Sequence, residues 1–318
     1  MTNLTNFYVS SVGGDISQSI ISIIRSSYPN AFIWGSDLHA EHAGVYQVDH
    51  FEVSPRFDSD DFLPWVGDLV RANSIDFYIP INEGELSRLA ELSENQRKSV
   101  LGNSKLIWAG ELAVRIFGDK RKTSDFIQRA QLPITKDFRK VNDIDVSDFP
   151  VLVKPNQGAG SRNVFKCNNA KELDAALVFV ADPIIQEYLD ADISEYTCAV
   201  FRAGSGVTKV LSLRRRLSGG TTSWAIADFN LTVDSLCRQL AEKIDLNGSV
   251  NVQLRIVDGI PKIFEINGRF SSTLALRDLL GFKDLLWSLG DMNGFDSFDV
   301  LKNQGRIVYK SVIGNVKN

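Results

Sequence analysis

The sequence has 318 residues, of which 44% are hydrophobic and 23% charged, and its formal net charge is −4. This composition is typical of a globular chain that can bury a core. The acidic balance disfavours a nucleic-acid partner, because nucleic-acid phosphates call for a basic surface. No apolar run approaches the roughly 20 residues that a membrane-spanning helix needs, so we expect no membrane partner.

The cysteines and the N-terminal stretch predict a reducing environment. Cys167, Cys198 and Cys237 are scattered and form no CxxC motif. The first residues lack the basic and small-residue features of a signal peptide. Together these features predict a cytoplasmic protein whose cysteines are buried thiols rather than nucleophiles.

The first third of the chain alternates strand patterns with helix patterns. Isoleucines in residues 16–29 recur on one helical face, and apolar runs on either side read as strands. This alternation predicts a doubly wound α/β domain with a parallel sheet, placed at residues 1–115. The expected strands are 6–12, 31–37, 46–54 and 75–83, and the expected helices are 16–29 and 62–74.

Two short patterns in this region allow a functional and a plain interpretation. Residues 13–15 (GGD) follow the first strand but lack the GxGxxG spacing of a dinucleotide-binding turn, so a tight strand-to-helix turn is preferred. His39, Glu41 and His42 lie in a short segment that ends in glycine. That context favours a solvated loop over a metal site.

The sequence pattern of the remaining two thirds of the chain predicts an α+β unit with antiparallel strands. Residues 118–137 predict a helix with Thr123 or Ser124 near its start and Pro133 as its stop. A tight Asp258-Gly259 turn joins the last two strands as a hairpin. The expected strands are 149–155, 163–167, 183–189, 195–202, 207–217, 250–257 and 261–267, and the other helices are 170–181 and 231–244.

The last hairpin carries oxygen ligands on one face. Glu265 and Asn267 alternate along one strand, and the tight turn can bring Gln253 opposite them. One carboxylate and two amide oxygens suit Mg²⁺, which is usually held by few carboxylates together with substrate phosphates. Arg269 continues the same face and can neutralise a phosphate. The alternative is a plain solvent-facing side of the sheet.

A lysine precedes a glycine-rich stretch in KPNQGAGSR, residues 154–162. A P-loop has the opposite order, with its lysine after the glycines. Lys154 closes an apolar strand, and the stretch after it can form a flap with free amides that closes over phosphates. Further on, an apolar strand ends at Glu187 and Leu189, whose backbone groups can meet an adenine edge, while the carboxylate of Glu195 can accept ribose hydroxyls.

These motifs, in this order, resemble the ATP-grasp superfamily. The segments are 119–123, 151–161, 186–197 and 251–269, and their pattern is most similar to the carbamoyl-phosphate-synthetase large-subunit branch. The resemblance covers most of residues 115–290 and implies two antiparallel sheets that enclose ATP, after a pre-ATP-grasp front domain. It implies a small lid subdomain at residues 116–185 and a large subdomain at 186–318. Gly268 departs from the pattern, because related enzymes often carry proline there.

The resemblance also implies a role for each matching position. Catalysis would involve Arg215, Arg269 and Lys154, with Arg215 the preferred member of the run Arg214-Arg215-Arg216. Mg²⁺ (or Mn²⁺) would be bound by Gln253, Glu265 and Asn267. ATP would be bound by Lys120, Lys154, Gly158, Ala159, Gly160, Ser161, Glu187, Tyr188, Leu189, Glu195 and Phe264.

The function implied is an ATP-dependent ligase that activates a small-molecule carboxylate as an acyl phosphate and joins it to an amine. A nucleotide-binding protein without turnover and an ATP-grasp phosphotransferase are the alternatives. Substrate-side candidates are Gly13, Gly14, Glu83, residues 218–222 and residues 271–273, although the last two segments could equally be a plain loop and a helix cap. The pattern does not define the oligomeric state, and a homodimer is kept as one candidate.

Overall fold

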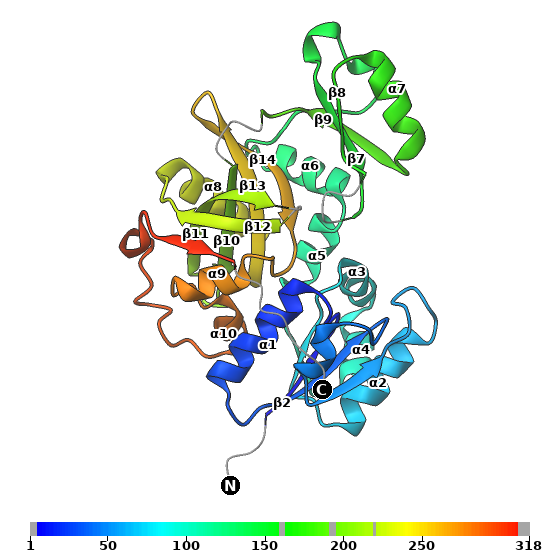
Figure 1. Cartoon of the computed structure of the whole chain (residues 1–318), viewed down its shortest axis with the longest axis vertical. Helices are drawn as coiled ribbons and strands as arrows, with labels where there is room; N and C mark the ends of the chain where they lie inside the picture. Colours follow the sequence, from blue (N-terminus) through cyan, green and yellow to red (C-terminus); the bar gives the residue numbers. More distant parts are fainter. Residues whose placement is uncertain (1–4, 159–162, 191–194, 219–220, 311–318) are drawn as a thin grey trace.

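The computed structural model describes residues 5–158, 163–190, 195–218 and 221–310 of the chain. Three sheets organise these residues: one parallel sheet in the front part and two antiparallel sheets after it (Figure 1). The predicted fold class is therefore confirmed. Within the described ranges, no helix is both long enough and apolar enough to cross a membrane.

The front part is a parallel five-stranded sheet in the order β3-β2-β1-β4-β5. Its central strands, β1 and β4, are nearly continuous apolar runs, as expected for strands covered on both faces. Ile20 and Ile24 of the first helix are fully buried, as the isoleucine periodicity predicts. The elements are β1 (Asn6–Val9), α1 (Asp15–Ser27), β2 (Phe32–Asp37), η1 (Ala43–Tyr46), β3 (His50–Val53), α2 (Phe62–Ala72), β4 (Phe77–Ile79), α3 (Glu83–Glu91), α4 (Glu94–Leu101) and β5 (Lys105–Leu106).

A small antiparallel sheet follows, in the order β6-β9-β7-β8, with one helix, α7, against it (Figure 1). Thr123 and Ser124 lie near the start of α6, as predicted, since this helix begins at Lys120. Asp119 caps it by accepting a hydrogen bond from the Lys122 N–H at 2.9 Å. The elements are α5 (Glu111–Phe117), α6 (Lys120–Arg129), β6 (Asp137–Phe138), η2 (Val141–Asp143), η3 (Val146–Asp148), β7 (Val151–Pro155), β8 (Phe165–Cys167), α7 (Ala170–Phe179) and β9 (Pro183–Glu187).

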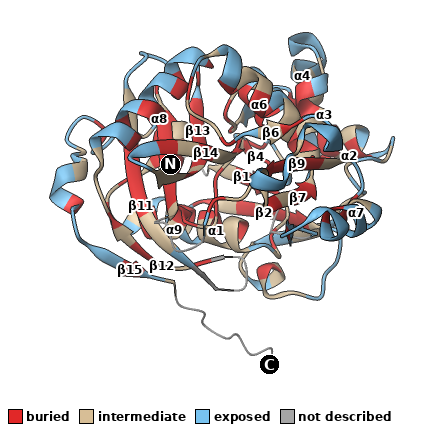
Figure 2. Cartoon of the chain, turned by 90° about the horizontal axis from the view of Figure 1, so that it is seen from above, coloured by how far each residue is buried: buried red, intermediate tan, exposed pale blue. Residues whose placement is uncertain are grey.

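The large antiparallel sheet has the order β14-β13-β10-β11-β12-β15. Helix α8 packs on one face, and residues of α9 and α10 pack on the other. Buried residues follow the strands, whereas α7 and α8 turn exposed sides outward (Figure 2). The elements are β10 (Glu195–Arg202), β11 (Thr208–Ser218), β12 (Thr221–Ala227), α8 (Leu231–Lys243), β13 (Gly248–Val257), β14 (Ile260–Asn267), α9 (Leu274–Leu279), α10 (Asp284–Leu289), η4 (Val300–Asn303) and β15 (Ile307–Tyr309).

The β13–β14 hairpin sets the register that matters for function. Asp258 and Gly259 both have positive φ, 51° and 79°, as a two-residue hairpin turn requires. A bulge after Gln253 shifts the pairing, so that Gln253 lies opposite Glu265 and Asn251 lies opposite Asn267. The predicted juxtaposition of Gln253 and Glu265 across the ladder is therefore confirmed.

The small and large sheets meet at the edge of β14. An isolated bridge joins Ile134 to Ile263, and the Thr135 N–H donates to the Ile263 carbonyl at 2.9 Å. The predicted boundary at residue 185 falls inside β9, and the division of the chain into three units stays a prediction. Cys167, Cys198 and Cys237 are buried free thiols, as predicted.

Candidate active site

A cavity of about 480 Å³ lies between the small sheet and the β13–β14 hairpin. Both antiparallel sheets and the N-terminus of α6 contribute to its wall. Every residue proposed from the sequence as catalytic, nucleotide-binding or metal-binding lines this cleft, provided that it lies within the described ranges. These residues are Lys120, Lys154, Gly158, Glu187, Tyr188, Leu189, Glu195, Arg215, Gln253, Phe264, Glu265, Asn267 and Arg269.

Lys154 is a buried cation that spans the two sheets. It lies on β7, is 5% exposed, and its Nζ donates to the Phe264 carbonyl of β14 at 3.1 Å. Burial lowers the pKa of Lys154 to about 8, although the attraction of Glu265 acts in the opposite direction. A neutral carbonyl compensates little of the cost of burying this charge. The side chain is therefore suited to an anion that enters the cleft.

Lys120 and Gly158 lie at one end of the cleft. The Lys120 Nζ donates to the carbonyls of Gly158 at 3.0 Å and of Asn156 at 3.3 Å. Gly158 has φ +130°, a conformation that favours glycine, so the chain can turn there into the predicted flap. The other flap positions, Ala159, Gly160 and Ser161, lie outside the described residues.

The metal-ligand candidates share the face of the hairpin that lines the cleft. Among the described residues, no hydrogen-bond or ion-pair partner of the Glu265 carboxylate is found, which leaves its oxygens available to a cation. Gln253 differs, because its Oε1 accepts a hydrogen bond from Arg215 at 2.7 Å. Glu265 and Asn267 fit a divalent cation by donor type and position, and the role of Gln253 as a ligand stays a prediction.

Arg215 points into the cleft, whereas its two neighbours do not line it. It is paired with Glu195 at 2.6 Å, and Arg255 holds the other carboxylate oxygen at 2.6 Å. Arg214 instead faces Asp228 at 3.5 Å. This alternation follows from the side-chain period of a strand. Glu195 is thus clamped by two guanidinium groups, and its contact with ribose stays a prediction.

The proposed adenine end of the cleft is formed by the end of β9. Several of its backbone groups already have protein partners. The Glu187 N–H donates to the Lys136 carbonyl, and the Leu189 carbonyl accepts a hydrogen bond from the Arg255 guanidinium. The Glu187 carboxylate is held by Lys262 at 2.9 Å. The adenine contacts of Glu187, Tyr188 and Leu189 therefore stay a prediction.

Arg269 connects the cleft to a second cavity, of about 810 Å³, at the front domain. Its guanidinium pairs with Glu83 at 2.8 Å, at the first residue of α3. Gly14 and Glu83 line this second cavity, at the carboxyl ends of the parallel strands, where such sheets bind ligands. The amide of Gly13 is instead engaged by Asp37 at 2.8 Å.

The other residues predicted to contact substrate lie in two segments, 218–222 and 271–273. The side chains of residues 218–221 lie outside the described part of the chain, and Thr222 accepts from Arg215 at 3.3 Å. The interpretation of residues 271–273 as a helix cap is wrong for Thr273, the N-cap of α9, whose side chain makes no capping bond. Ser271 and Ser272 line the cleft instead.

Sequence reasoning did not propose several residues of the cleft wall, among them Arg255, Asp15 and Asn251. Arg255 clamps Glu195, Asp15 lies where the two cavities join, and Asn251 is fully buried beside Asn267. Asn251 could have been found, since it continues the alternation of polar residues one step before Gln253. Arg255 and Asp15 carry no local signal, because only the tertiary fold brings them to the cleft.

Comparison with known proteins agrees with this geometry. Residues 117–273 match the family model described as an ATP-grasp domain. The resemblance to the ATP-grasp superfamily that the motifs predict is therefore confirmed for this part of the chain. A D-alanine–D-alanine ligase from Fusobacterium nucleatum subsp. nucleatum is 34% identical over 113 residues, which cover 35% of this chain and 38% of that ligase. The match thus spans well under two thirds of the ligase.

Solved structures share the fold at low sequence identity. The biotin carboxylase domain of 2-oxoglutarate carboxylase from Hydrogenobacter thermophilus, solved with MgADP, ADP and bicarbonate, has a TM-score of 0.71 at 16% identity, covering 92% of this chain and 70% of its own. L-amino acid ligase from Bacillus licheniformis has a TM-score of 0.67 at 17% identity, covering 86% and 70%. N5-carboxyaminoimidazole synthetase from Staphylococcus aureus, complexed with ADP, has a TM-score of 0.67 at 15% identity, covering 89% and 76%.

Proposed function

We propose that the protein is an ATP- and Mg²⁺-dependent ligase that activates a small-molecule carboxylate and joins it to an amine. The observation that carries the proposal is the position of Lys154, buried between the two antiparallel sheets and directed at β14 beside Glu265 and Asn267. A cation on one wall and free oxygen ligands on the other suit a metal–triphosphate. The ATP-grasp family match and the ADP-bound relatives support this proposal.

The residues of the cleft would divide the work as follows. Lys154, Lys120 and Arg215 bind phosphate oxygens and offset the charge that spreads over them during transfer. Glu265 and Asn267 hold the metal, which would neutralise and orient the phosphates when bound. The adenosine end of the nucleotide would occupy the part of the cleft lined by residues 187–189, Glu195 and Phe264.

The reaction needs no protein nucleophile. A substrate carboxylate oxygen attacks the γ-phosphorus, and ADP leaves. The amine nitrogen then attacks the acyl carbon, inorganic phosphate leaves, and the nitrogen loses a proton. Arg269 lies where the nucleotide cleft meets the front cavity, so it can bind the carboxylate as it is phosphorylated. The front cavity, lined by Glu83, Asp58 and Glu91 among others, would admit the amine.

A substrate screen tests the proposal. The protein is given ATP, Mg²⁺ and a panel of carboxylates and amino acids, and phosphate release is measured. We expect one carboxylate–amine pair to stimulate release and to yield an amide by mass spectrometry, and the Glu265→Ala variant to abolish both. If no pair releases phosphate while the protein binds MgADP, the ligase proposal is wrong.

A protein that binds nucleotide without turnover is the second candidate. The hydrogen bond from Arg215 to Gln253 favours it, because that bond occupies an oxygen otherwise available to a second metal ion. Tight ATP binding that survives Glu265→Ala, with no product from any pair, would support this candidate. A stable phosphorylated product in place of an amide would instead indicate a phosphotransferase.

A further inference from the structure

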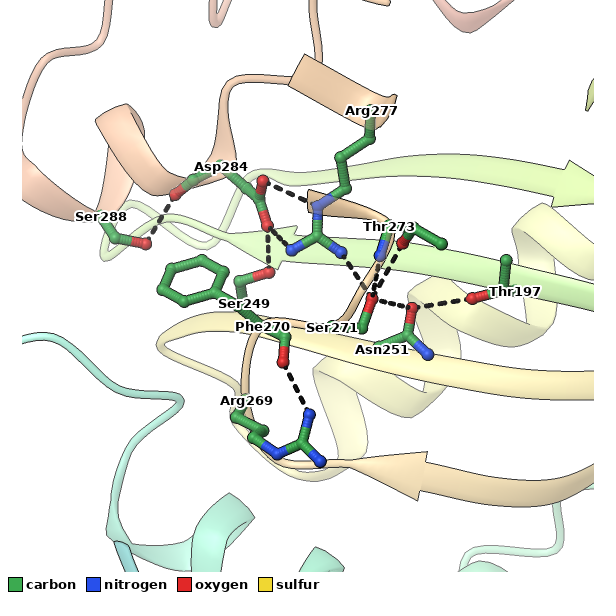
Figure 3. Close-up of polar contacts among 10 residues, drawn as sticks. All are labelled: Thr197, Ser249, Asn251, Arg269, Phe270, Ser271, Thr273, Arg277, Asp284 and Ser288. Carbon is green, nitrogen blue, oxygen red and sulfur yellow. Dashed lines mark hydrogen bonds and ion pairs between the residues drawn. The ribbon is translucent and has the colours of Figure 1, made fainter. Parts of the chain in front are cut away.

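Asn251 presents a buried donor without a partner at the wall of the cleft. It lies on β13, is 0% exposed, and is one of the lining residues. Its Oδ1 accepts hydrogen bonds from the hydroxyls of Thr197 at 2.9 Å and Ser271 at 3.0 Å (Figure 3). Its Nδ2 has no hydrogen-bond partner among the residues that the structure describes. Such a group is costly to leave unpaired, so its presence at a cleft indicates a ligand acceptor.

The surrounding hydroxyls determine which way this amide faces. The Ser271 Oγ accepts from the Arg277 Nη1 and from the Thr273 N–H, each at 3.4 Å. The Ser271 Oγ also lies 2.8 Å from the Thr273 Oγ1, and with the Thr273 hydroxyl as the donor of that bond the Ser271 hydrogen is directed at the Asn251 Oδ1. Figure 3 shows the Asn251 oxygen facing Ser271 and Thr197 and its nitrogen turned away from both.

A buried ion pair supports Ser271 from behind. Arg277 and Asp284 are both 0% exposed, and two guanidinium nitrogens of Arg277 donate to the Asp284 carboxylate at 3.0 and 2.6 Å. Ser249 donates to the same carboxylate at 2.5 Å. This fully paired arrangement leaves Arg277 little freedom to move. The donor of Asn251 is therefore held in place before any ligand arrives.

The position of Asn251 along the hairpin distinguishes the ligand. Gln253 pairs with Glu265, whereas Asn251 pairs with Asn267, one side-chain repeat or about 7 Å further along the face. Asn267 is itself a metal-ligand candidate, so this step runs from the Gln253–Glu265 pair past Asn267 and toward Arg269 and Ser271. Asn251 thus faces the part of the cleft between the proposed phosphate site and the front cavity.

We propose that the Asn251 Nδ2 donates to a carboxylate oxygen of the substrate that is phosphorylated, next to Arg269. This inference rests on the proposed function and names the group that would fix the carboxylate for attack. Arg269 would bind the same carboxylate from its other side. The two contacts together would hold the attacking oxygen in position toward the γ-phosphate.

The Asn251→Asp variant tests the inference most sharply. Aspartate keeps the oxygen that Thr197 and Ser271 bond and replaces the donor with an acceptor. The matched control is Asn303→Asp, at a buried asparagine that does not line the cleft and whose Nδ2 already donates to the Leu280 carbonyl at 2.8 Å. Both variants bury an aspartate, and only the first removes the proposed donor.

Two measurements distinguish an effect on nucleotide binding from an effect on carboxylate binding. In Asn251→Asp we expect the Kd of MgADP, measured by calorimetry, to change less than about threefold, while the KM of the best carboxylate of the screen rises about 10- to 100-fold, the size expected for a hydrogen bond to a charged group. Asn303→Asp should change neither constant. A weakened MgADP affinity with an unchanged carboxylate KM would overturn the inference, as would two unchanged constants.

A crystal structure with MgADP and a high concentration of formate gives a readout that needs no turnover. We expect a formate oxygen within hydrogen-bond distance of the Asn251 Nδ2, and no formate there in the Asn251→Asp protein. A protein group bonded to this nitrogen, or an empty site in the unmodified protein, overturns the inference. If MgADP itself fails to bind, the proposed function fails, and the inference fails with it.

Discussion

Two buried charges near the cleft are compensated in opposite ways. The Arg277–Asp284 pair is fully buried, doubly hydrogen-bonded and supported by Ser249. Lys154 is nearly as buried, yet it donates to one neutral carbonyl. The two charges of the Arg277–Asp284 pair compensate one another within the protein, so removing either one would destabilise the fold. Among the described residues Lys154 donates only to a neutral group, so its burial costs stability, and we propose that a bound anion compensates its charge.

The buried carboxyl group of Glu85 is intermediate between the fully paired Arg277–Asp284 site and Lys154. This buried acid in the front part of the chain accepts hydrogen bonds from the hydroxyls of Ser10, at 2.5 Å, and Tyr78, and no ion pair to it is found among the described residues. Burial raises the pKa of Glu85 to about 7, although these hydrogen bonds act in the opposite direction. The three sites therefore predict three different responses to mutation and pH.

The largest effect is expected at the paired site. Asp284→Ala leaves the Arg277 guanidinium buried without a counter-ion and should lower the free energy of unfolding by about 3–5 kcal/mol. Urea denaturation measures this change. The double variant Arg277→Met/Asp284→Leu removes both charges and should recover most of the loss. A cost below about 1 kcal/mol for Asp284→Ala would show that the pair is not structural.

A smaller effect is expected from the titration of Glu85. Its folded pKa of about 7 lies above the unfolded value of 4.5, so the folded state binds more protons between these pH values, and stability falls as pH rises through this window. The fall should be at most about 3 kcal/mol between pH 4.5 and pH 7, and then level off.

Unfolding at pH 5 and pH 8 checks this expectation. Glu85→Gln cannot ionise and should lose most of the pH dependence, whereas Glu91→Gln, an exposed position on the same helix, should keep it. An equally steep slope in Glu85→Gln would assign the pH dependence to other groups.

At Lys154, removing the buried charge should raise the free energy of unfolding rather than lower it. Its lowered pKa means that burial of the charged form costs stability, so Lys154→Met should stabilise the protein by about 1–3 kcal/mol at pH 7. The same variant should bind MgADP at least about tenfold more weakly. Lys171→Met, at an exposed position on α7, is the control and should change neither quantity. A destabilised Lys154→Met protein would contradict the contrast with Arg277–Asp284.

Local sequence patterns predict the parts of this molecule that depend on local rules. Period-two alternation places Glu265 and Asn267 on one face of β14, and the Asp258-Gly259 turn makes β13 and β14 antiparallel. The turn alone would set Gln253 opposite Phe264, so the bulge after Gln253 is needed to bring it opposite Glu265. The same alternation distinguishes Arg215 from its two neighbours. For Arg215 the strand period fixes the side-chain direction before any tertiary contact forms, whereas the bulge in the hairpin has no signal that periodicity could reveal.

Contacts between distant segments could not be predicted in this way. The Arg255–Glu195 pair joins residues 60 positions apart, and Ser249 meets Asp284 across 35 positions. Neither pair has a spacing that periodicity could reveal.

The most direct test of the central claim is proton uptake on nucleotide binding. If phosphates lie against Lys154, its pKa of about 8 rises on binding, and the protein takes up about half a proton per MgADP at pH 8. Calorimetric titrations in two buffers of different ionisation enthalpy measure this number. We expect about half a proton in the unmodified protein, none in Lys154→Met, and an affinity that weakens as pH rises above 8. Equal uptake and equal affinity in both proteins would place the phosphates elsewhere and contradict the account.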